Sequence, residues 1–247
     1  MKRLQLIQTL FEKTNFKTYL EIGCYKGKTF FPVRAKRKIA VDPFFHPFFI
    51  KDAIFTIIRR PQNLTNRYFK ETSDRFFMKQ QSFLNKTAPL DVVFVDGLHT
   101  YEAALKDVLH ALKYLSENGV IIMHDCFPPN QAAALATKDY PTMEERKKVE
   151  GFTGAWCGDV WKAVVYLRRH LSDILDVSVI NSDNGLGIVR TKKKLGDKVF
   201  CIDKKLFLEI DALTYNELVE NADVFLNLIA SDQASTIIDN IVAKANS

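Results

Sequence analysis

Two segments of the chain place carboxylates and imidazoles directly after runs of apolar residues. In DVVFVDGLHTYE, Asp96 follows one such run and His99 comes three residues later. In GVIIMHDCF, a second run leads into His124 and Asp125. If the two runs are neighbouring strands, Asp96 and Asp125 converge at one rim of the sheet, where two carboxylates repel unless a cation or a proton lies between them. Such oxygen ligands suit Mg²⁺, and the imidazoles also suit Mn²⁺ or another transition metal.

The same residues have a structural alternative. Asp96 would then cap the helix that follows it, and the histidines would be satisfied groups of the core. A lone histidine would favour that interpretation. Two His–Asp neighbourhoods at two strand ends favour a functional site instead.

A loop bracketed by glycines follows an earlier apolar run, in LEIGCYKGKTF. Glu21 ends the run, and Gly23 and Gly27 let the backbone approach a ligand above the strand ends. The G-x-x-x-G spacing lacks the middle glycine of a dinucleotide fingerprint, so it favours a nucleoside without a pyrophosphate over NAD. Asp42, at the end of the next run, is placed to accept the hydroxyls of a ribose. The alternative is that Asp42 only starts a turn.

Positioning these residues requires a sheet whose strands end at one rim. Short β-rich runs alternate with helical patterns, an order typical of a mostly parallel sheet covered by helices on both faces. The runs expected to form strands are 18–22, 38–41, 68–72, 91–95, 120–124, 177–180 and 186–190. The turn-forming sequence NSDNG between the last two predicts an antiparallel hairpin. We therefore predict a doubly wound, seven-stranded α/β sheet with an antiparallel last hairpin.

The remaining segments are assigned by their periodicity. Helices are expected near the N-terminus and over 73–84, 100–115 and 160–171. Residues 126–157 lack periodicity and follow the fifth strand, where ligands bind, so they predict a substrate lid. The aromatic run 43–49 is a candidate wall of the substrate pocket, although core packing is favoured for most of its rings. Residues 1–202 are expected to form one domain, and 203–247 a helical extension.

Composition limits the partners and the location. The 247 residues carry a net charge of +6, with 47% hydrophobic and 26% charged residues, as in ordinary globular proteins. The basic residues are dispersed, which argues against a nucleic-acid partner. No signal peptide or membrane-spanning run is evident, so we expect a cytoplasmic protein with no membrane partner. The expected partner is a small molecule. Four widely spaced cysteines predict free thiols, and a homo-oligomer stays open.

Several segments together carry a resemblance to a known family. LEIGCYKGKTF, IAVDPF, ETSDRFF, VFVDGLHTYEAALKDV, IIMHDCFPP and GDVWKAVVYLR resemble the class I S-adenosylmethionine-dependent methyltransferases, which have a Rossmann-like fold. More narrowly, they resemble the methyltransferase domain family that includes metal-dependent sugar O-methyltransferases. The likeness extends from about Tyr19 to Arg190. It implies a transferase that binds S-adenosyl-L-methionine.

The resemblance also implies roles for individual residues. The cofactor would contact Glu21, Gly23 and Gly27 with its methionine part, Asp42 with its ribose, Thr72, Ser73 and Asp74 with its adenine, and Asp96 nearby. Asp96 and Asp125 match two metal-ligand positions of the metal-dependent relatives, for Mg or Mn. The position before Asp125 is His124 rather than a carboxylate, which departs from the family pattern. His99 matches the position of a general base and is expected, with Asp96, to be catalytic.

The sequence therefore predicts methyl transfer to an oxygen of a sugar or another small polar metabolite. His99 would take the proton from the acceptor hydroxyl, and a metal on Asp96 and Asp125 would orient the oxygen. Two alternatives are a nicotinamide-dependent Rossmann oxidoreductase and a catalytically silent nucleoside-binding module. The oxidoreductase would share the fold and Asp42 but would not explain the glycine spacing.

Overall fold

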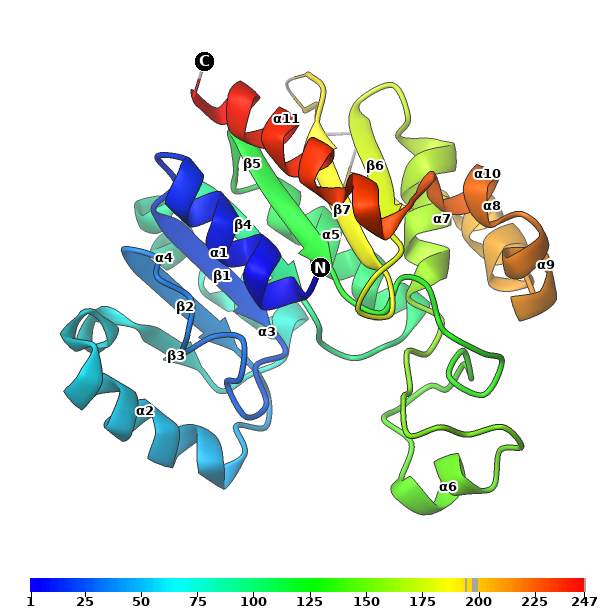
Figure 1. Cartoon of the computed structure of the whole chain (residues 1–247), viewed down its shortest axis with the longest axis horizontal. Coiled ribbons are helices and arrows are strands. Elements are labelled where there is room, and N and C mark those ends of the chain that lie inside the picture. The colour runs from blue at the N-terminus through cyan, green and yellow to red at the C-terminus, as the bar shows by residue number, and fades with distance from the viewer. Residues whose placement is uncertain (194, 197–199, 247) are drawn as a thin grey trace.

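The fold is built on one sheet of eight strands in the order β3-β2-β1-β4-β5-β7-β6-β8 (Figure 1). The computed structural model describes residues 1–193, 195–196 and 200–246, so the last residue of the predicted extension, Ser247, lies outside the described residues. The strands are β1 (Thr18–Ile22), β2 (Arg37–Val41), β3 (Arg67–Phe69), β4 (Leu90–Val95), β5 (Leu115–Met123), β6 (Leu175–Ile180), β7 (Leu186–Thr191) and β8 (Leu228–Ile229).

Helices connect these strands and form the C-terminal extension. They are α1 (Arg3–Lys13), α2 (Pro47–Arg59), α3 (Ser73–Lys79), α4 (Gln81–Thr87), α5 (Tyr101–Leu112), α6 (Met143–Lys147), α7 (Trp161–His170), α8 (Lys204–Asp211), α9 (Tyr215–Glu220), α10 (Ala222–Leu226) and α11 (Ala234–Asn246), with short 3₁₀ turns η1 (Pro61–Thr65) and η3 (Ser231–Gln233). No helix in the described part of the chain is long and apolar enough to cross a lipid bilayer.

The strand directions confirm the predicted fold class. Strands β3, β2, β1, β4 and β5 are parallel, and β7 runs antiparallel to both of its neighbours, β5 and β6. All seven expected strands are present, and β8 adds a short eighth strand parallel to β6. The order reverses between β1 and β4, where parallel α/β sheets open a crevice for ligands at the carboxyl ends of their strands.

Alternation along the strands divides the core into two layers. In β4, Val92 and Phe94 face a cluster with α1 and α11, whereas Val93 and Val95 face a cluster with α5 and α7. All four side chains are buried, as expected for a strand covered on both faces. Figure 1 shows α1 and α11 on the near side of the sheet and α5 on the far side. The Lys13 ammonium lies 3.1 Å from Asp239, which links α1 to α11.

Several predicted boundaries were wrong. The helix expected over 73–84 is two helices that meet at Gln80, and β3 ends at Phe69 so that Thr72 caps α3. The helix expected over 100–115 ends at Leu112, because the chain from Leu115 onward pairs with β4. Helix α2 was not predicted. Residues 126–157 contain one short helix, α6, and otherwise turns and irregular chain.

Candidate active site

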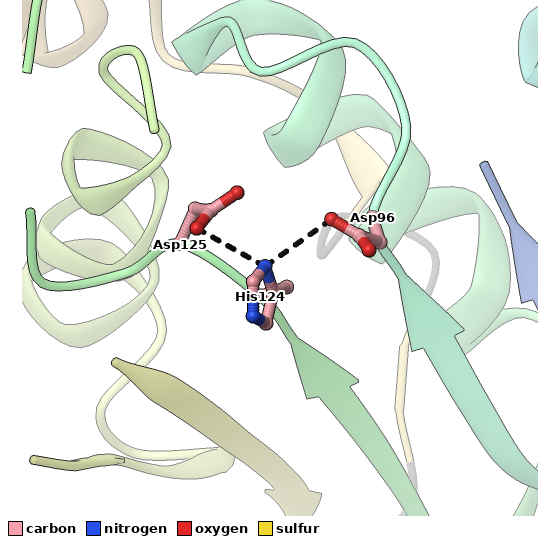
Figure 2. Close-up of side chains that lie close together, drawn as sticks. All are labelled: Asp96, His124 and Asp125. Carbon is pink, nitrogen blue, oxygen red and sulfur yellow. Dashed lines mark ion pairs between the residues drawn. The ribbon is translucent and has the colours of Figure 1, made fainter. Parts of the chain in front are cut away.

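Two acidic residues and a histidine meet at the carboxyl ends of β4 and β5. The two strands are parallel with Val95 opposite Met123, so the residues that follow them emerge side by side. His124 Nδ1 lies 3.3 Å from Asp96 Oδ1 and 3.1 Å from Asp125 Oδ1. Figure 2 shows the imidazole between the two carboxylates. The structure thus brings together the two residues expected to hold a metal.

His124 joins this pair as a third candidate ligand. One ligand atom from each of Asp96, His124 and Asp125 lies within 4.8 Å of the others. The His124 side chain is 6% exposed, and its Nδ1 faces both carboxylates within ion-pair distance. The three side chains thus direct one nitrogen and several oxygen atoms, all possible metal ligands, toward one point. The residues present therefore fit a divalent cation with oxygen and imidazole ligands.

The cluster includes two residues that sequence reasoning missed. Asp183, in the turn between β6 and β7, has Oδ2 3.7 Å from His124 Nε2. The Arg3 guanidinium contacts His124 Nε2 and lies 3.6 Å from Asp96 Oδ2, and the Arg3 amide donates to Asp183 at 3.0 Å. Asp183 lies in a turn-forming sequence and Arg3 in an amphipathic helix, and both are more than 50 residues away from the other members. Neither position carries a local signal for a site.

His99 lies against both carboxylates. Its Nε2 is 3.3 Å from Asp96 Oδ1, and its Nδ1 is 3.3 Å from Asp125 Oδ2. The carbonyl oxygen of Trp156 lies 2.9 Å from Nδ1, and the two rings stack with centroids 5.2 Å apart. Both ring nitrogens face oxygen acceptors, and the Trp156 carbonyl and Asp125 together favour the proton of the neutral ring on Nδ1.

The start of α5 and the end of residues 126–157 fix the position of His99. Thr100 caps α5 by accepting the amide of Ala103, so His99 is the last residue before a rigid helix. Asp159 accepts the Tyr101 amide at 2.7 Å. Gly158 has a φ of +61°, and a Cβ there would lie 1.8 Å from the His99 carbonyl oxygen. A glycine is therefore required for the two segments to pass this closely.

The charged groups of the cluster shift the pKa values of one another. Burial alone would raise the pKa of Asp96, but the imidazoles of His124 and His99 hold it well below its usual range. Burial alone would lower the pKa of His124, but the charge of Asp96 and hydrogen bonds with Asp125, Asp183 and Asp96 raise it to about 11. The pKa of His99 is also raised, because Asp96 and Asp125 outweigh its burial. With neutral imidazoles, three carboxylates face one guanidinium, an excess of negative charge that favours a bound cation.

The glycine loop lies at the neighbouring strand end, after β1. Gly23 has a φ of +86°, and a Cβ there would lie 1.9 Å from the carbonyl oxygen of Asp96. The absence of a side chain thus lets this loop pass close to the backbone of the acidic cluster. Gly27 donates its amide to the carbonyl of Cys24 at 2.6 Å and closes the turn. Both glycines were predicted to line the methionine part of a cofactor, and that role stays a prediction.

Asp42 anchors the glycine loop from the end of β2. Its Oδ2 accepts the amide of Tyr25 and its Oδ1 accepts the amide of Phe44, each at 2.7 Å. Tyr25 is half exposed and has a φ of +41°, a strained conformation that clusters at functional sites. Asp42 thus holds the glycine loop, and its predicted contact with the ribose hydroxyls stays a prediction.

Glu21 lies on β1, two residues before Gly23 of the glycine loop. It is 2% exposed and accepts a 2.5 Å hydrogen bond from the Tyr19 hydroxyl. Burial raises the pKa of Glu21 to about 8. The nearby Lys38 is buried as well, donates to the carbonyls of Phe30 and Val33, and has a pKa lowered by burial to about 7. The carboxyl group of Glu21 is thus part of an internal polar network, and its predicted contact with the cofactor stays a prediction.

Thr72, Ser73 and Asp74 lie at the start of α3, on the far side of Asp42. Thr72 accepts the amide of Arg75, and the carboxylate of Asp74 lies 3.8 Å from His110 Nδ1 on α5. All three residues are at least partly exposed. The predicted adenine edge therefore lies on an accessible turn, and its role stays a prediction.

The aromatic run 43–49 divides between core and surface. Phe49 is buried against Phe31 and Phe45, whereas Phe44 and Phe48 are exposed. Core packing was expected for most of these rings, and the exposed pair does not follow that expectation. The run begins α2, with His46 as its N-cap.

Comparisons with known proteins bear on the fold and on the domain family. Residues 20–126 match the family model of a methyltransferase domain. A protein from Staphylococcus aureus assigned as a caffeoyl-CoA O-methyltransferase is 18% identical, covers 78% of this chain and 85% of its own, and superposes with a TM-score of 0.53. An O-methyltransferase from Bacillus cereus, solved in complex with SAH, is 13% identical over 76% of this chain and 80% of its own, with a TM-score of 0.48. Only the first likeness is close enough to support a shared fold. No curated protein matches the chain significantly.

Proposed function

We propose that this chain, whose residues 20–126 match a methyltransferase domain, is an S-adenosylmethionine-dependent methyltransferase of class I that methylates a hydroxyl of a sugar or another small polar metabolite. The observation that carries the proposal is the position of His99. The imidazole lies between two carboxylates at the carboxyl ends of β4 and β5, and the Trp156 carbonyl faces its Nδ1. The methyltransferase domain favours this function over a nicotinamide-dependent oxidoreductase.

The cofactor would be held at the ends of β1 and β2. Asp42 would accept the ribose hydroxyls, Gly23 and Gly27 would let the loop approach the methionine part, and the turn at Thr72 would border the adenine. S-Adenosylmethionine, when bound, supplies the methyl group of its sulfonium sulfur to the acceptor oxygen and leaves as S-adenosylhomocysteine. A methyl donor of this kind is already reactive, so holding the acceptor in line contributes much of the rate.

His99 would accept the acceptor's proton at Nε2. The Trp156 carbonyl, 2.9 Å from Nδ1, holds the ring in the tautomer that can do so. As the proton arrives, the imidazole becomes cationic, and Asp96 and Asp125 stabilise that charge from 3.3 Å on either side. The acceptor would lie beneath residues 126–157, whose last part reaches His99 through Trp156.

A divalent cation, Mg²⁺ or Mn²⁺, would be held by Asp96 and Asp125 with His124 as a third ligand. When bound, the cation would lower the pKa of the acceptor hydroxyl. Arg3 and Asp183 would orient His124 and Asp96 from outside the ligand set. Without the cation, protonated imidazoles would balance the same carboxylates, so metal binding is expected to release protons.

The decisive experiment is turnover of labelled S-adenosylmethionine against a panel of sugars and small hydroxylated metabolites, with and without added Mg²⁺. Label transferred to a hydroxyl of one class of acceptor supports the proposal. Cofactor binding without transfer to any acceptor would instead support the catalytically silent binding module. Transfer to nitrogen or carbon would contradict the oxygen acceptor.

A further inference from the structure

Helix α2 carries an apolar surface that the fold leaves uncovered. Figure 1 shows α2 at the edge of the molecule beside β3, with no other described element on its outer side. The exposed apolar side chains on the helix and next to its two ends, here called the α2 surface, are Phe44, Phe48, Ile54, Phe55, Ile58 and Leu64. Ile58 is 76% exposed and Ile54 62% exposed. Contiguous apolar side chains of this kind mark a contact surface, because single exposed residues are common but grouped ones are not.

Contacts on the opposite face of the helix hold this surface outward. Phe49 is buried, and its ring centroid lies 4.7 Å from that of Phe31 and 4.4 Å from that of Phe45. At the other end, Arg60 donates to the carbonyl of Pro32 at 2.8 Å. The helix is therefore fixed at both ends, and rotation that buries Phe55 and Ile58 would break both attachments.

Cations surround the apolar side chains. Residues 43–70 contain five basic residues and one acidic residue, Asp52. The Arg59 guanidinium lies 4.4 Å from the ring centroid of Phe55, and the Lys26 ammonium lies within 6.0 Å of that of Phe48. Lys51 is exposed on the same helix. The α2 surface is thus both apolar and cationic.

We propose that the α2 surface docks on an anionic membrane surface. An amphipathic helix with aromatic, aliphatic and basic side chains on its exposed face lies in the lipid headgroup region, where both apolar burial and attraction to anionic lipids favour it. A second copy of the chain fits less well, because a two-fold contact would set the same basic residues against themselves. This partner departs from the expectation from sequence, which included no membrane.

Docking would bring the glycine loop close to the bilayer. His46, the N-cap of α2, donates its amide to the carbonyl of Tyr25 at 3.1 Å, and the two rings lie 5.0 Å apart. The α2 surface is therefore continuous with the loop at the end of β1. A membrane-bound enzyme in this orientation would open its site toward molecules at the lipid surface.

Flotation with vesicles tests the proposal with the full chain. Phosphatidylcholine vesicles with phosphatidylglycerol should carry the wild type upward, and phosphatidylcholine alone should carry much less. The double variant Phe55→Ser/Ile58→Ser should lower the partition coefficient by at least about tenfold, because two side chains leave the apolar phase. Lys51→Gln/Arg59→Gln should lower it several-fold, and added salt should lower that of the wild type but change the charge variant less.

Leu208→Ser/Val224→Ser is the matched control, because these side chains on α8 and α10 are 66% and 72% exposed. It should float like the wild type. Melting curves of all variants separate loss of binding from loss of folding, and Ile58→Ser alone provides a milder variant. Equal flotation of the α2 and control variants, or none by the wild type, would overturn the proposal. A dimer that Phe55→Ser/Ile58→Ser dissociates, in a protein that does not bind vesicles, would replace the membrane with a second copy.

Discussion

The two halves of the strand-end rim are built by different interactions. After β1 and β2, backbone amides satisfy the carboxylate of Asp42, and the glycine loop is closed by its own hydrogen bonds. After β4 and β5, side chains face side chains, and His124 Nδ1 lies between the carboxylates of Asp96 and Asp125. The first half is therefore held in one conformation by hydrogen bonds within the protein. The second holds an excess of negative charge that a cation or protons on the imidazoles can balance.

The contrast is sharpest at His99. His99→Ala should lower methyl transfer by roughly 10²–10⁴-fold, because it removes the proton acceptor. S-Adenosylhomocysteine should bind almost unchanged, since the imidazole belongs to the other half of the rim. Turnover and melting temperature measured on one preparation check both statements, with exposed His170→Ala as the control. A folded His99→Ala enzyme with an intact rate would end the assignment.

The excess charge after β4 and β5 predicts a metal requirement. Chelation should abolish most activity, and Mg²⁺ or Mn²⁺ should restore it. Asp125→Asn should weaken Mn²⁺ binding by more than about 100-fold, because loss of an outer partner of a ligand alone costs 10–100-fold. Calorimetric titration measures this, with Asp176→Asn on β6, away from the site, as the control. Unchanged turnover in excess chelator would remove the metal and leave the imidazoles as the balancing charges.

For the half of the rim after β1 and β2, we predict that substitution weakens only the binding of the cofactor. Asp42→Ala should weaken S-adenosylhomocysteine binding by about 10–100-fold for each ribose hydroxyl that loses its hydrogen bond, and NAD should not raise the melting temperature of either protein. Asp91→Ala is a demanding control, because Asp91 also accepts two backbone amides, from Lys17 and Thr18, but at the opposite ends of the strands. If both variants bind the ligand equally well, Asp42 only shapes the loop.

Substitution of Asp107, which is buried on α5, should have the smallest effect, and the effect should be on stability. Burial raises the pKa of Asp107 to about 7, despite a hydrogen bond with Ser73, and Oδ1 has no hydrogen-bond partner among the described residues. Because the pKa of Asp107 is higher in the folded than in the unfolded chain, protonated Asp107 stabilises the fold. This contribution to the free energy of unfolding is fully present below about pH 4 and is lost as the pH rises through about 7. Asp107→Asn should therefore stabilise the protein by about 2–3 kcal/mol more at pH 8 than at pH 5.

Melting curves at the two pH values measure this difference. The expected gain corresponds to a few degrees in melting temperature for a chain of this size. Ser73→Ala is the companion variant, since it removes the partner and keeps the carboxyl group. The same gain at both pH values would mean that packing, rather than ionisation, decides the effect of Asp107.

The parallel core was predictable because its signals are local. Strands β2, β4 and β5 end in apolar runs that are followed by a polar residue, and the period of two in β4 directs its side chains into both layers. That pattern placed Asp96 and Asp125 at one rim once β4 and β5 were taken as neighbours. His99 followed from its distance of three residues from Asp96. These predictions depend on spacing along a few residues.

The remainder depended on contacts that spacing does not encode. Arg3 and Asp183 reach His124 from opposite ends of the chain, and neither sequence neighbourhood differs from an ordinary helix or turn. Helix α2 was missed because two prolines and a dense run of aromatics hide its period, and because many of its apolar residues face outward. The short strand β8 was missed because two residues give no alternation to detect.

The contact between Trp156 and His99 has a consequence for how acceptor range evolves. Residues 136–155 lie between two fixed points, the Leu135 carbonyl that accepts the Trp156 indole N–H at 2.9 Å and the Trp156 carbonyl beside His99. Replacing the chain between those points changes the walls that an acceptor meets, while the proton acceptor keeps its tautomer and position. The segment is thus an exchangeable module, and grafting it between related domains is a direct route to new acceptors.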